Sequence, residues 1–555
     1  MAARDEADVV VIGSGAGGAP AAWHLSQAGA RVVVLERGHY YTIRDFTHDE
    51  VGVCLRDMFV PHPSRHPHTI VKSDERRERT REGWIGVCVG GGTVHMSGYV
   101  YRLHPEDLRM RTLFSGVPDA NLADWPIDYS ELAPWYDRVD ALMGVSGRAD
   151  ANPFDPPRRP YPLPPLLPHP VVKLLDPAAR GLGFHPYPTP RLVLSRPYGG
   201  RPGCTLCGFC VEFGCENGSK SSVLATLIPE AEATGRCQIR PRCQARRVMV
   251  DGEARVRGVE YIDAHGEVRF IGARVVVLAA SAVESARILL LSANSRFPRG
   301  LANGSGQVGR NLMFSTFGKA TAVFDRQEMA AVLGLERMHF PFVQRSIQDD
   351  YLNEKAAFPF PKGGTYNFLG QLPYPISATL RLSMDEGWRL WGAPLRDAVR
   401  SYFHDELWVE VETFGEFLPW QGCRVELDPE VKDQHDLPVA CIHLRHHPLD
   451  VEVNKRMVRR AMDILEAVRP RAKKVTPWSW GQTTFHVQQG TARFGKDPAS
   501  SVLGPDCQAH EVRNLYVTDG SFMPTSGGVP STLTILANSL RVANIIGERF
   551  QRHEI

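Results

Sequence analysis

The sequence predicts an α/β protein in which a Rossmann-type dinucleotide-binding domain is interleaved with an α+β substrate domain built on an antiparallel sheet. Three observations lead to this prediction: a glycine-rich turn between two apolar runs near the N-terminus, a further apolar run at 273–280, and short alternating runs from about 320 to 480. Buried parallel strands read as continuous apolar runs, whereas antiparallel strands commonly alternate apolar and polar residues. The length of 555 residues exceeds what one hydrophobic core usually serves, so we expect two joined domains.

The N-terminal runs predict a strand, a helix and a second strand. DVVVIG from Asp8 is followed by SGAGGAPAAWHLSQAGA and then by RVVVLE. Pro20 is compatible with the helix because an N–H in the first turn has no intrahelical partner to lose. ARVVVLAA at 273–280 predicts another strand, and SAVESARILLLS predicts a helix after it.

Gly13, Gly15 and Gly18 form a G-x-G-x-x-G motif directly after the first strand. The glycines permit a tight turn and a close backbone approach, and the helix N-terminus behind them attracts a pyrophosphate. Glu36 closes the second strand 23 residues after Gly13, where a carboxylate can accept hydrogen bonds from ribose hydroxyls. The motif alone would also suit a simple strand-to-helix turn, but strand, helix and acidic residue in register predict a dinucleotide site. It does not separate FAD from NAD.

The central and C-terminal regions predict the second domain. LWVEVETFG and CRVELD alternate like antiparallel strands, and DVEVNKRMVRRAMDILEAV reads as an amphipathic helix. The stretch 152–170 holds too many prolines for a helix or a central strand, so it predicts an extended connector.

Composition excludes several classes of protein. Apolar residues make up 43% and charged residues 23%, and 64 basic against 62 acidic side chains leave a net charge of only +2. Nucleic-acid binding is therefore not expected. The N-terminus lacks a charged-then-apolar leader, and no apolar run approaches the roughly 20 residues of a membrane span. We expect a cytoplasmic protein, exported only if a partner carries it.

Two further segments carry a family resemblance. GVCVGGGTVHMSG at 86–98 is a second glycine-rich loop, and VRNLYVTDGSFMPTSGGVPSTLTILANSLRVANII near the C-terminus reads as a strand, an acidic turn and a long helix. Together with the opening motif they resemble the glucose-methanol-choline (GMC) oxidoreductases, which bind FAD with these parts of the chain. The likeness covers most of the chain. Its central phrases are most similar to the bacterial branch of gluconate, fructose and glucoside 3-dehydrogenase catalytic subunits.

The resemblance implies a division of the chain and a set of FAD contacts. It places the FAD domain in 1–115, 200–318 and 500–555, and the substrate domain in 116–199 and 319–499. Besides the opening motif, the implied FAD contacts are Gly90, Gly91, Gly92, Thr93, His95, Asp519, Gly520 and Thr532. A histidine in a similar context is joined covalently to the flavin in the related pyranose oxidases. His95 invites the same expectation, with a histidine that merely hydrogen-bonds beside the cofactor as the alternative.

Four of the eleven cysteines lie within twelve positions, at Cys204, Cys207, Cys210 and Cys215. Thiolates this close on a glycine-containing loop can converge on one iron-sulfur cluster. The x4 spacing departs from the ferredoxin run, a zinc site prefers two separated pairs, and a disulfide is unexpected in reducing cytosol. In the resembling family, some glucose dehydrogenase subunits carry such a cluster and many relatives carry similar cysteines without a metal. A cluster that passes electrons to an external acceptor and a purely structural loop both stay open.

The catalytic residues depart from the family pattern. Oxidation of an alcohol by a flavin needs a base for the hydroxyl proton, a task that suits histidine. The resembling enzymes carry H-x-x-G-T and a second histidine or asparagine before a proline. Here HVQQGT puts His486 one residue early, and Pro530 stands where asparagine is usual. Proline offers no side-chain hydrogen bond.

Three accounts of this departure remain. A local bulge restores His486 as the base. Alternatively, Gln488 or Gln489 holds the substrate hydroxyl while another histidine acts, for which the candidates are His446, His447 and His510. In the third account the protein performs a dehydrogenation or a lyase reaction on the same fold. Asn538 lies too far along the final helix to replace the missing residue.

The function predicted from these residues is an FAD-dependent dehydrogenase or oxidase. It removes a hydride from the CH–OH group of a sugar, glycoside or polyol to flavin N5, with His486 as the base. We expect a small hydroxylated substrate as its ligand, and a small subunit, a cytochrome or a quinone as possible partners for the electrons.

Overall fold

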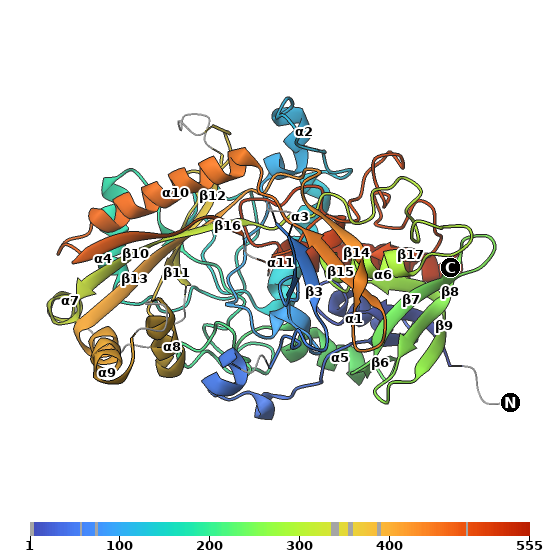
Figure 1. The fold of residues 1–555 in the computed structure, drawn as a ribbon, viewed down its shortest axis with the longest axis horizontal. Coiled ribbons are helices and arrows are strands. Elements are labelled where there is room, and N and C mark those ends of the chain that lie inside the picture. Colours follow the sequence, from blue (N-terminus) through green and yellow to red (C-terminus); the bar gives the residue numbers. More distant parts are fainter. Residues whose placement is uncertain are drawn as a thin grey trace.

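The computed structural model describes residues 5–55, 58–72, 76–334, 343–352, 359–385, 390–483, 485 and 487–555. Three sheets organise these residues. Figure 1 shows a seven-stranded sheet at one end of the molecule and a six-stranded sheet at the other, with most of the loop-rich chain between them.

The seven-stranded sheet runs in the order β6-β2-β1-β9-β8-β7, and β17 also pairs with β9. The pairs β1–β2, β1–β9, β2–β6 and β9–β17 are parallel, whereas β7–β8 and β8–β9 are antiparallel. The continuous apolar runs of the sequence form its centre, because a strand covered on both faces buries every side chain. Its strands are β1 (Glu6–Ile12), β2 (Val32–Leu35), β6 (Cys237–Arg240), β7 (Gln244–Val250), β8 (Val256–Ile262), β9 (Val268–Leu278) and β17 (Leu515–Val517).

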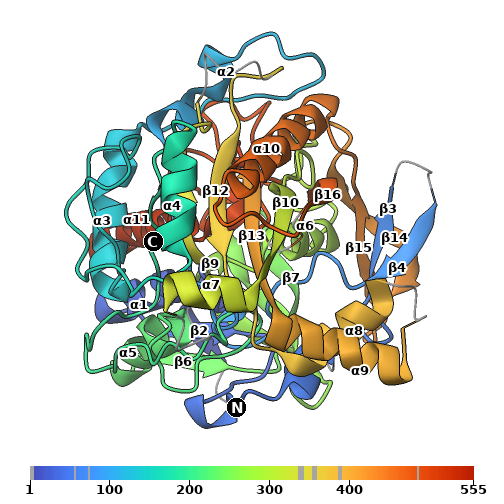
Figure 2. The ribbon, with the colours of Figure 1, turned by 90° about the vertical axis from the view of Figure 1, so that its left-hand side faces the viewer.

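The six-stranded sheet is antiparallel in every pair and runs in the order β16-β10-β13-β12-β11-β5. This confirms the α+β domain predicted from the alternating runs. One face packs under helix α10 (Pro448–Glu466), which crosses β10 and β13 in Figure 2. Its strands are β5 (Tyr187–Pro188), β10 (Thr316–Asp325), β11 (Val343–Ile347), β12 (Gly364–Leu369), β13 (Glu406–Gly415) and β16 (Lys474–Thr483).

A four-stranded sheet, in the order β14-β15-β3-β4, joins two distant parts of the chain. It pairs the N-terminal region with the region near 440, because β3 lies parallel to β15. The strands are β3 (His68–Val71), β4 (Arg77–Thr80), β14 (Arg424–Lys432) and β15 (Pro438–His443). The sequence did not predict this sheet.

The helices complete the layers. Helix α1 packs against α11 and α5, and α11 packs against α3. The proline-rich stretch 152–170 contains no helix and no named strand, although all of its residues are described. The remaining α-helices are α1 (Ala19–Gln27), α2 (Met110–Leu113), α3 (Tyr129–Met143), α4 (Val172–Gly181), α5 (Leu227–Ala233), α6 (Ala282–Leu291), α7 (Arg326–Leu333), α8 (Pro375–Asp385), α9 (Gly392–Arg400) and α11 (Thr532–Gln551). Within the part of the chain that the structure describes, none of these helices is long and apolar enough to cross a bilayer.

Candidate active site

Two glycines of the opening motif, Gly13 and Gly18, leave no room for side chains. Gly13 has a φ of +94°, and a Cβ on it would lie 2.4 Å from the carbonyl oxygen of Ala279. A Cβ on Gly18 would lie only 1.9 Å from the carbonyl oxygen of Gly13. The turn therefore closes tightly between β1 and α1, and residues 13–17, directly before α1, line the cavity, where a helix N-terminus favours a pyrophosphate.

Glu36 follows β2 and lines the same cavity. Its carboxylate accepts hydrogen bonds from the Ser14 backbone at 3.1 Å, the Ser14 hydroxyl at 2.7 Å and the Gly38 backbone at 2.8 Å. Burial raises the pKa of the Glu36 carboxyl, and these donors pull the pKa back in part. The carboxylate thus fixes the motif turn from within as well as facing the cavity.

The second glycine-rich loop packs directly on this turn. The Gly90 N–H donates to the Ser14 hydroxyl at 3.1 Å, and the Thr93 hydroxyl donates to the Gly90 carbonyl at 2.7 Å. Gly91, Gly92, Thr93 and His95 line the cavity, whereas Gly90 supports the loop from behind. The His95 ring stacks on Phe59, with 5.1 Å between the ring centroids.

The C-terminal segment forms another part of the cavity wall and contacts the N-terminal turn, since the Thr518 hydroxyl donates to the Gly17 carbonyl at 2.8 Å. Asp519 accepts from the Ser285 hydroxyl at 2.5 Å and the Ser521 backbone at 2.8 Å, and burial raises the pKa of its carboxyl. A Cβ on Gly520 would lie 2.1 Å from the carbonyl oxygen of Gln488, so this position is also closed to side chains. Thr532 begins α11 at the cavity wall, where the N-terminal end of the helix dipole favours negative charge.

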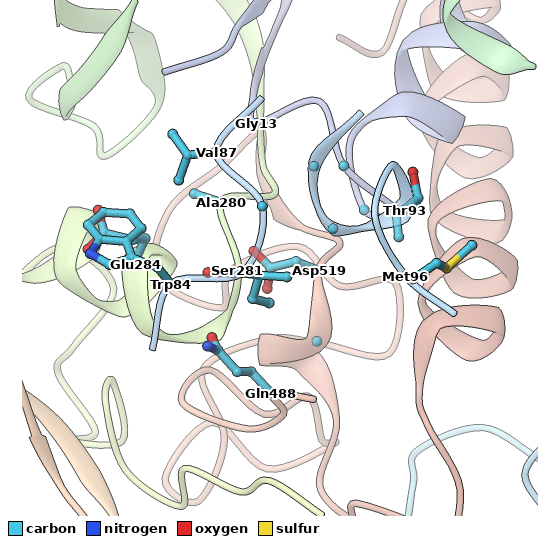
Figure 3. Close-up of a pocket in the computed structure, with 18 of the residues that line it drawn as sticks. Gly13, Trp84, Val87, Thr93, Met96, Ala280, Ser281, Glu284, Gln488 and Asp519 are labelled. Atoms are coloured by element: carbon cyan, nitrogen blue, oxygen red, sulfur yellow. The ribbon is translucent and has the colours of Figure 1, made fainter. Parts of the chain in front are cut away.

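These segments enclose one cavity of about 460 Å³, a size typical of cofactor sites. Figure 3 shows Gly13, Ser281, Asp519 and Gln488 around it. One close contact was missed from the sequence, since a Cβ on Gly17 would lie 2.8 Å from Asp519 Cα. The only signal in the sequence was that Gly17, at a variable position of the motif, is also a glycine.

The residues of HVQQGT lie at different depths. His486 is outside the described residues, while Val487 and Gln488 line the cavity. The Gln488 amide donates to the carbonyls of Gly83 at 2.7 Å and Phe485 at 3.0 Å, and accepts from the Val283 backbone at 3.4 Å. Both of its N–H donors are thus engaged by the protein, which leaves none for a substrate hydroxyl.

Gln489 does not line the cavity and is fully buried. Its amide, oriented to satisfy its neighbours, donates to the carbonyls of Phe314 at 3.1 Å and Met313 at 3.2 Å. Its oxygen accepts from the Ser531 hydroxyl at 3.1 Å. The side chain therefore anchors the segment next to Pro530, which does line the cavity.

The other histidine candidates and Asn538 do not line the cavity either, because the fold uses them elsewhere. His446 packs against Phe417, and His447 caps α10 by accepting from the Leu449 backbone. His510 is hydrogen-bonded to the Ser501 hydroxyl, and the Asn538 amide donates to the Cys507 sulfur.

Sequence reasoning missed the part of the cavity wall that Tyr99 and the six-stranded sheet provide. Tyr99, just after the second glycine-rich loop, lines the cavity together with Phe414 of β13. Burial, and after it the charge of Glu412, a buried carboxylate on the same strand as Phe414, raises the pKa of the Tyr99 phenol. The alternation VEVETF carried a signal, but charged residues at every second position normally indicate a face toward solvent.

The four loop cysteines border a second cavity, of only about 20 Å³, together with Lys220. This space suits about one water molecule rather than a cluster. Among the described residues, no group of three or more histidine, cysteine, aspartate or glutamate side chains is arranged to hold a metal ion. The Lys220 ammonium donates to the carbonyls of Met96, Cys210 and Phe213, and burial lowers its pKa to about 8. The loop is thus tied to Met96 in the wall of the large cavity.

Comparison with known proteins agrees with this geometry. The chain matches GMC oxidoreductase profiles over residues 169–316 and 419–539, and an NAD(P)-binding Rossmann-like domain over residues 11–70. It is 30% identical over 542 residues to the 6'''-hydroxyparomomycin C oxidase of Streptomyces lividus, covering 97% of this chain and 91% of that protein. It is 28% identical over 565 residues to the fructose dehydrogenase large subunit of Gluconobacter japonicus, covering 97% of each.

Among solved structures, the fold is similar to that of a formate oxidase from Aspergillus oryzae RIB40, studied for FAD modification. The TM-score is 0.68 at 17% identity, with 99% of each chain covered. Family profile, relatives and fold agree with the motifs that line the cavity. The chain belongs to the GMC oxidoreductase family of FAD-dependent enzymes.

Proposed function

We propose that this protein oxidises a hydroxyl group of a sugar, glycoside or polyol with FAD as its cofactor. The observation that carries the proposal is the single cavity that the N-terminal turn, the second glycine-rich loop and the C-terminal segment enclose. The names of the two relatives, an aminoglycoside oxidase and a fructose dehydrogenase subunit, support a hydroxylated carbohydrate as the substrate class.

The chain's own residues divide the work. The turn of Gly13 to Gly18 and the N-terminus of α1 hold the pyrophosphate, and Glu36 holds the ribose end. Bound FAD supplies the hydride acceptor. His486 is the proposed base for the hydroxyl proton, on the strength of its motif and of the place of Val487 in the cavity wall. Gln488 positions this segment by tying it to Gly83 and α6.

The rival is a lyase or another non-oxidative reaction on the same fold, motivated by Pro530. The named relatives are an oxidase and a dehydrogenase subunit, which favours net oxidation. Anaerobic mixing of the purified holoenzyme with paromomycin, D-fructose and methyl glucopyranoside separates the two. Oxidation predicts bleaching of the flavin absorbance by at least one of them, and a slower bleaching in His486→Asn. A carbohydrate that is consumed without bleaching supports the rival.

The iron-sulfur reading of Cys204, Cys207, Cys210 and Cys215 is not part of the proposed reaction, because the small cavity they border does not fit a cluster. It stays a prediction that iron and sulfide analysis of the purified protein decides. About three irons per chain, lost in Cys207→Ser, would support a cluster. Protein without iron but with full flavin content would support a structural loop.

Two further parts of the proposal concern a covalent bond between the flavin and His95 and the partner that accepts the electrons. A covalent bond at His95 would leave flavin fluorescence on the polypeptide after denaturing electrophoresis, and His95→Ala would abolish it. The name of the relative from Gluconobacter japonicus, a large subunit, supports a search for a small subunit or a cytochrome that takes the electrons, with a quinone as the alternative acceptor. A cytoplasmic location, unless such a partner carries the chain outward, belongs to the same proposal.

A further inference from the structure

A row of polar side chains crosses the six-stranded sheet on the face turned away from α10. Lys319 of β10 stands directly opposite Glu412 of β13, Glu412 stands opposite Asn367 of β12, and Asn367 stands opposite Ser346 of β11. Glu412 is 3% exposed, and Asn367 and Ser346 are fully buried. Buried polar groups are costly unless each is hydrogen-bonded, so such a row indicates a specific task.

The row is fully connected around Glu412. The Asn367 amide donates to the Glu412 carboxylate at 3.1 Å, and the Ser346 and Tyr101 hydroxyls donate to the Asn367 oxygen at 2.9 Å and 2.5 Å. The Lys319 ammonium bonds Glu410 at 2.9 Å and also attracts Glu412. These contacts hold the Glu412 carboxylate in one orientation.

One side chain connects this row to the cavity. Tyr99 lines the cavity, and its phenol interacts with the charge of Glu412, which does not itself line the cavity. Phe414, two residues along the strand from Glu412, lines the cavity beside Tyr99, with 6.0 Å between the ring centroids. Tyr99 is the only tyrosine among the described residues of the cavity wall.

Among the described residues of the cavity wall, Pro530 stands where the resembling enzymes usually carry a histidine or an asparagine. Pro530 offers no hydrogen bond, and both donors of Gln488 are engaged by backbone carbonyls. We infer that Tyr99 binds a hydroxyl group of the substrate, with Glu412 as the positioning residue that holds the phenol in place. The inference rests on the proposed function. A phenol that turns its hydrogen toward Glu412 leaves its oxygen to accept the hydroxyl hydrogen of the substrate.

The titration of Glu412 fits this arrangement. Burial raises the pKa of the Glu412 carboxyl to about 7, while Lys319, Tyr99 and the hydrogen bond from Asn367 hold it from rising further. Above this pH the ionised Glu412 carboxylate attracts the phenolic hydrogen of Tyr99. Below this pH the carboxyl is protonated and no longer attracts that hydrogen as an anion does. The other charged or titratable groups that face the pair are Glu410 toward Glu412, and Tyr101 and Arg191 toward Tyr99.

Three variants test the inference in the FAD-loaded enzyme. They are Tyr99→Phe, Glu412→Gln and the control Tyr516→Phe, whose hydroxyl is bonded to Arg549 far from the cavity wall. The probes are paromomycin, D-fructose and methyl glucopyranoside, and the first readout is the dissociation constant from the change each causes in the visible flavin spectrum. This readout does not need turnover, so a ligand that binds without bleaching contradicts the proposed function while still testing the pair.

We expect Tyr99→Phe to weaken binding of the best probe roughly three- to tenfold, the usual contribution of one hydrogen bond. Flavin content and Tyr516→Phe should match the wild type. Glu412→Gln should remove the change in the dissociation constant that the wild type shows around pH 7. Wild-type affinity in Tyr99→Phe, or an unchanged pH profile in Glu412→Gln, would overturn the inference; so would a wild type that binds none of the probes.

Discussion

The two ends of the large cavity are built in different ways. The dinucleotide end is made of backbone: Gly13, Gly18 and Gly520 stand where a Cβ would strike a carbonyl oxygen. The sheet end is made of side chains, with Tyr99 and Phe414 at the wall and Glu412 behind it. A backbone site depends on local turns, whereas a side-chain site depends on the register of distant strands. Substitutions at the dinucleotide end should therefore act by steric exclusion, and substitutions at the sheet end should act by changing electrostatic interactions.

The largest effect is expected at the backbone end. Gly18→Ala would place a methyl group 1.9 Å from the Gly13 carbonyl oxygen, so the turn cannot close. We expect little or no flavin to co-purify, measured as the ratio of flavin to protein absorbance. Gly181→Ala is the control, because a Cβ there meets nothing within 4 Å. Full flavin content in Gly18→Ala would contradict the backbone account.

The next largest effect is expected at a buried group of charges around Lys362. Lys362 is fully buried between Asp107, at 2.5 Å, and Glu416, which also accepts the Ser526 hydroxyl beside the C-terminal cavity segment. Lys362→Met leaves two buried carboxylates without their cation and should cost about 3–5 kcal/mol in the free energy of unfolding.

Lys432→Met is the matched control, since its pair with Asp436 is exposed and should change the free energy by no more than about 0.5 kcal/mol. Denaturant titration measures both. Equal effects in the two variants would mean that the buried triad does not stabilise the fold.

The third effect is a dependence of stability on pH. The pKa of Glu412 is raised from 4.5 to about 7, so the folded protein binds this proton more tightly than the unfolded chain does. The stability that the proton contributes is present in full below about pH 4.5 and is lost as the pH rises to about 7. Glu412→Gln removes this loss. Between pH 4.5 and 8, the free energy of unfolding of the wild type should therefore decrease by up to about 3 kcal/mol relative to that of the variant. Denaturant titration at each pH measures this difference. A constant difference would contradict the raised pKa.

The smallest effect returns to the dinucleotide end. Glu36→Gln replaces an acceptor of three hydrogen bonds with an amide that turns a donor toward Ser14 or Gly38. We expect FAD to bind about tenfold more weakly, about 1.4 kcal/mol, by fluorescence titration of the apoprotein. The exposed Glu253→Gln should bind FAD as the wild type does. An effect of Glu36→Gln larger than that of Gly18→Ala would reverse the proposed ranking.

The same contrast explains what the sequence could predict. Gly13, Gly15, Gly18 and Glu36 were identified because turn geometry and strand patterns are local properties of the chain. The antiparallel sheet was predicted from alternating runs: LWVEVETFG forms β13 of that sheet, whereas CRVELD forms β14 of the four-stranded sheet. The four-stranded sheet was missed because β3 and β4 are short and because β3 pairs with β15, near residue 440, a long-range contact that no local sequence pattern indicates.

The sheet end of the cavity could not be predicted for a related reason. Lys319, Asn367 and Glu412 meet only through the register of β10, β12 and β13, and Tyr99 joins them from a loop far away in the sequence. The glutamines of HVQQGT were considered for their chemistry, yet their amides hold backbone carbonyls of neighbouring segments. Chemistry-bearing residues in a motif thus mark the place of a site more reliably than the role of each side chain in it.

Anaerobic titration of the purified holoenzyme with a carbohydrate that binds it tests the central claim most directly. Oxidation of a hydroxyl group predicts that one equivalent of substrate bleaches one equivalent of flavin and yields one equivalent of a carbonyl product. A protein that binds no flavin, or one that converts the carbohydrate while its flavin stays oxidised, would contradict it.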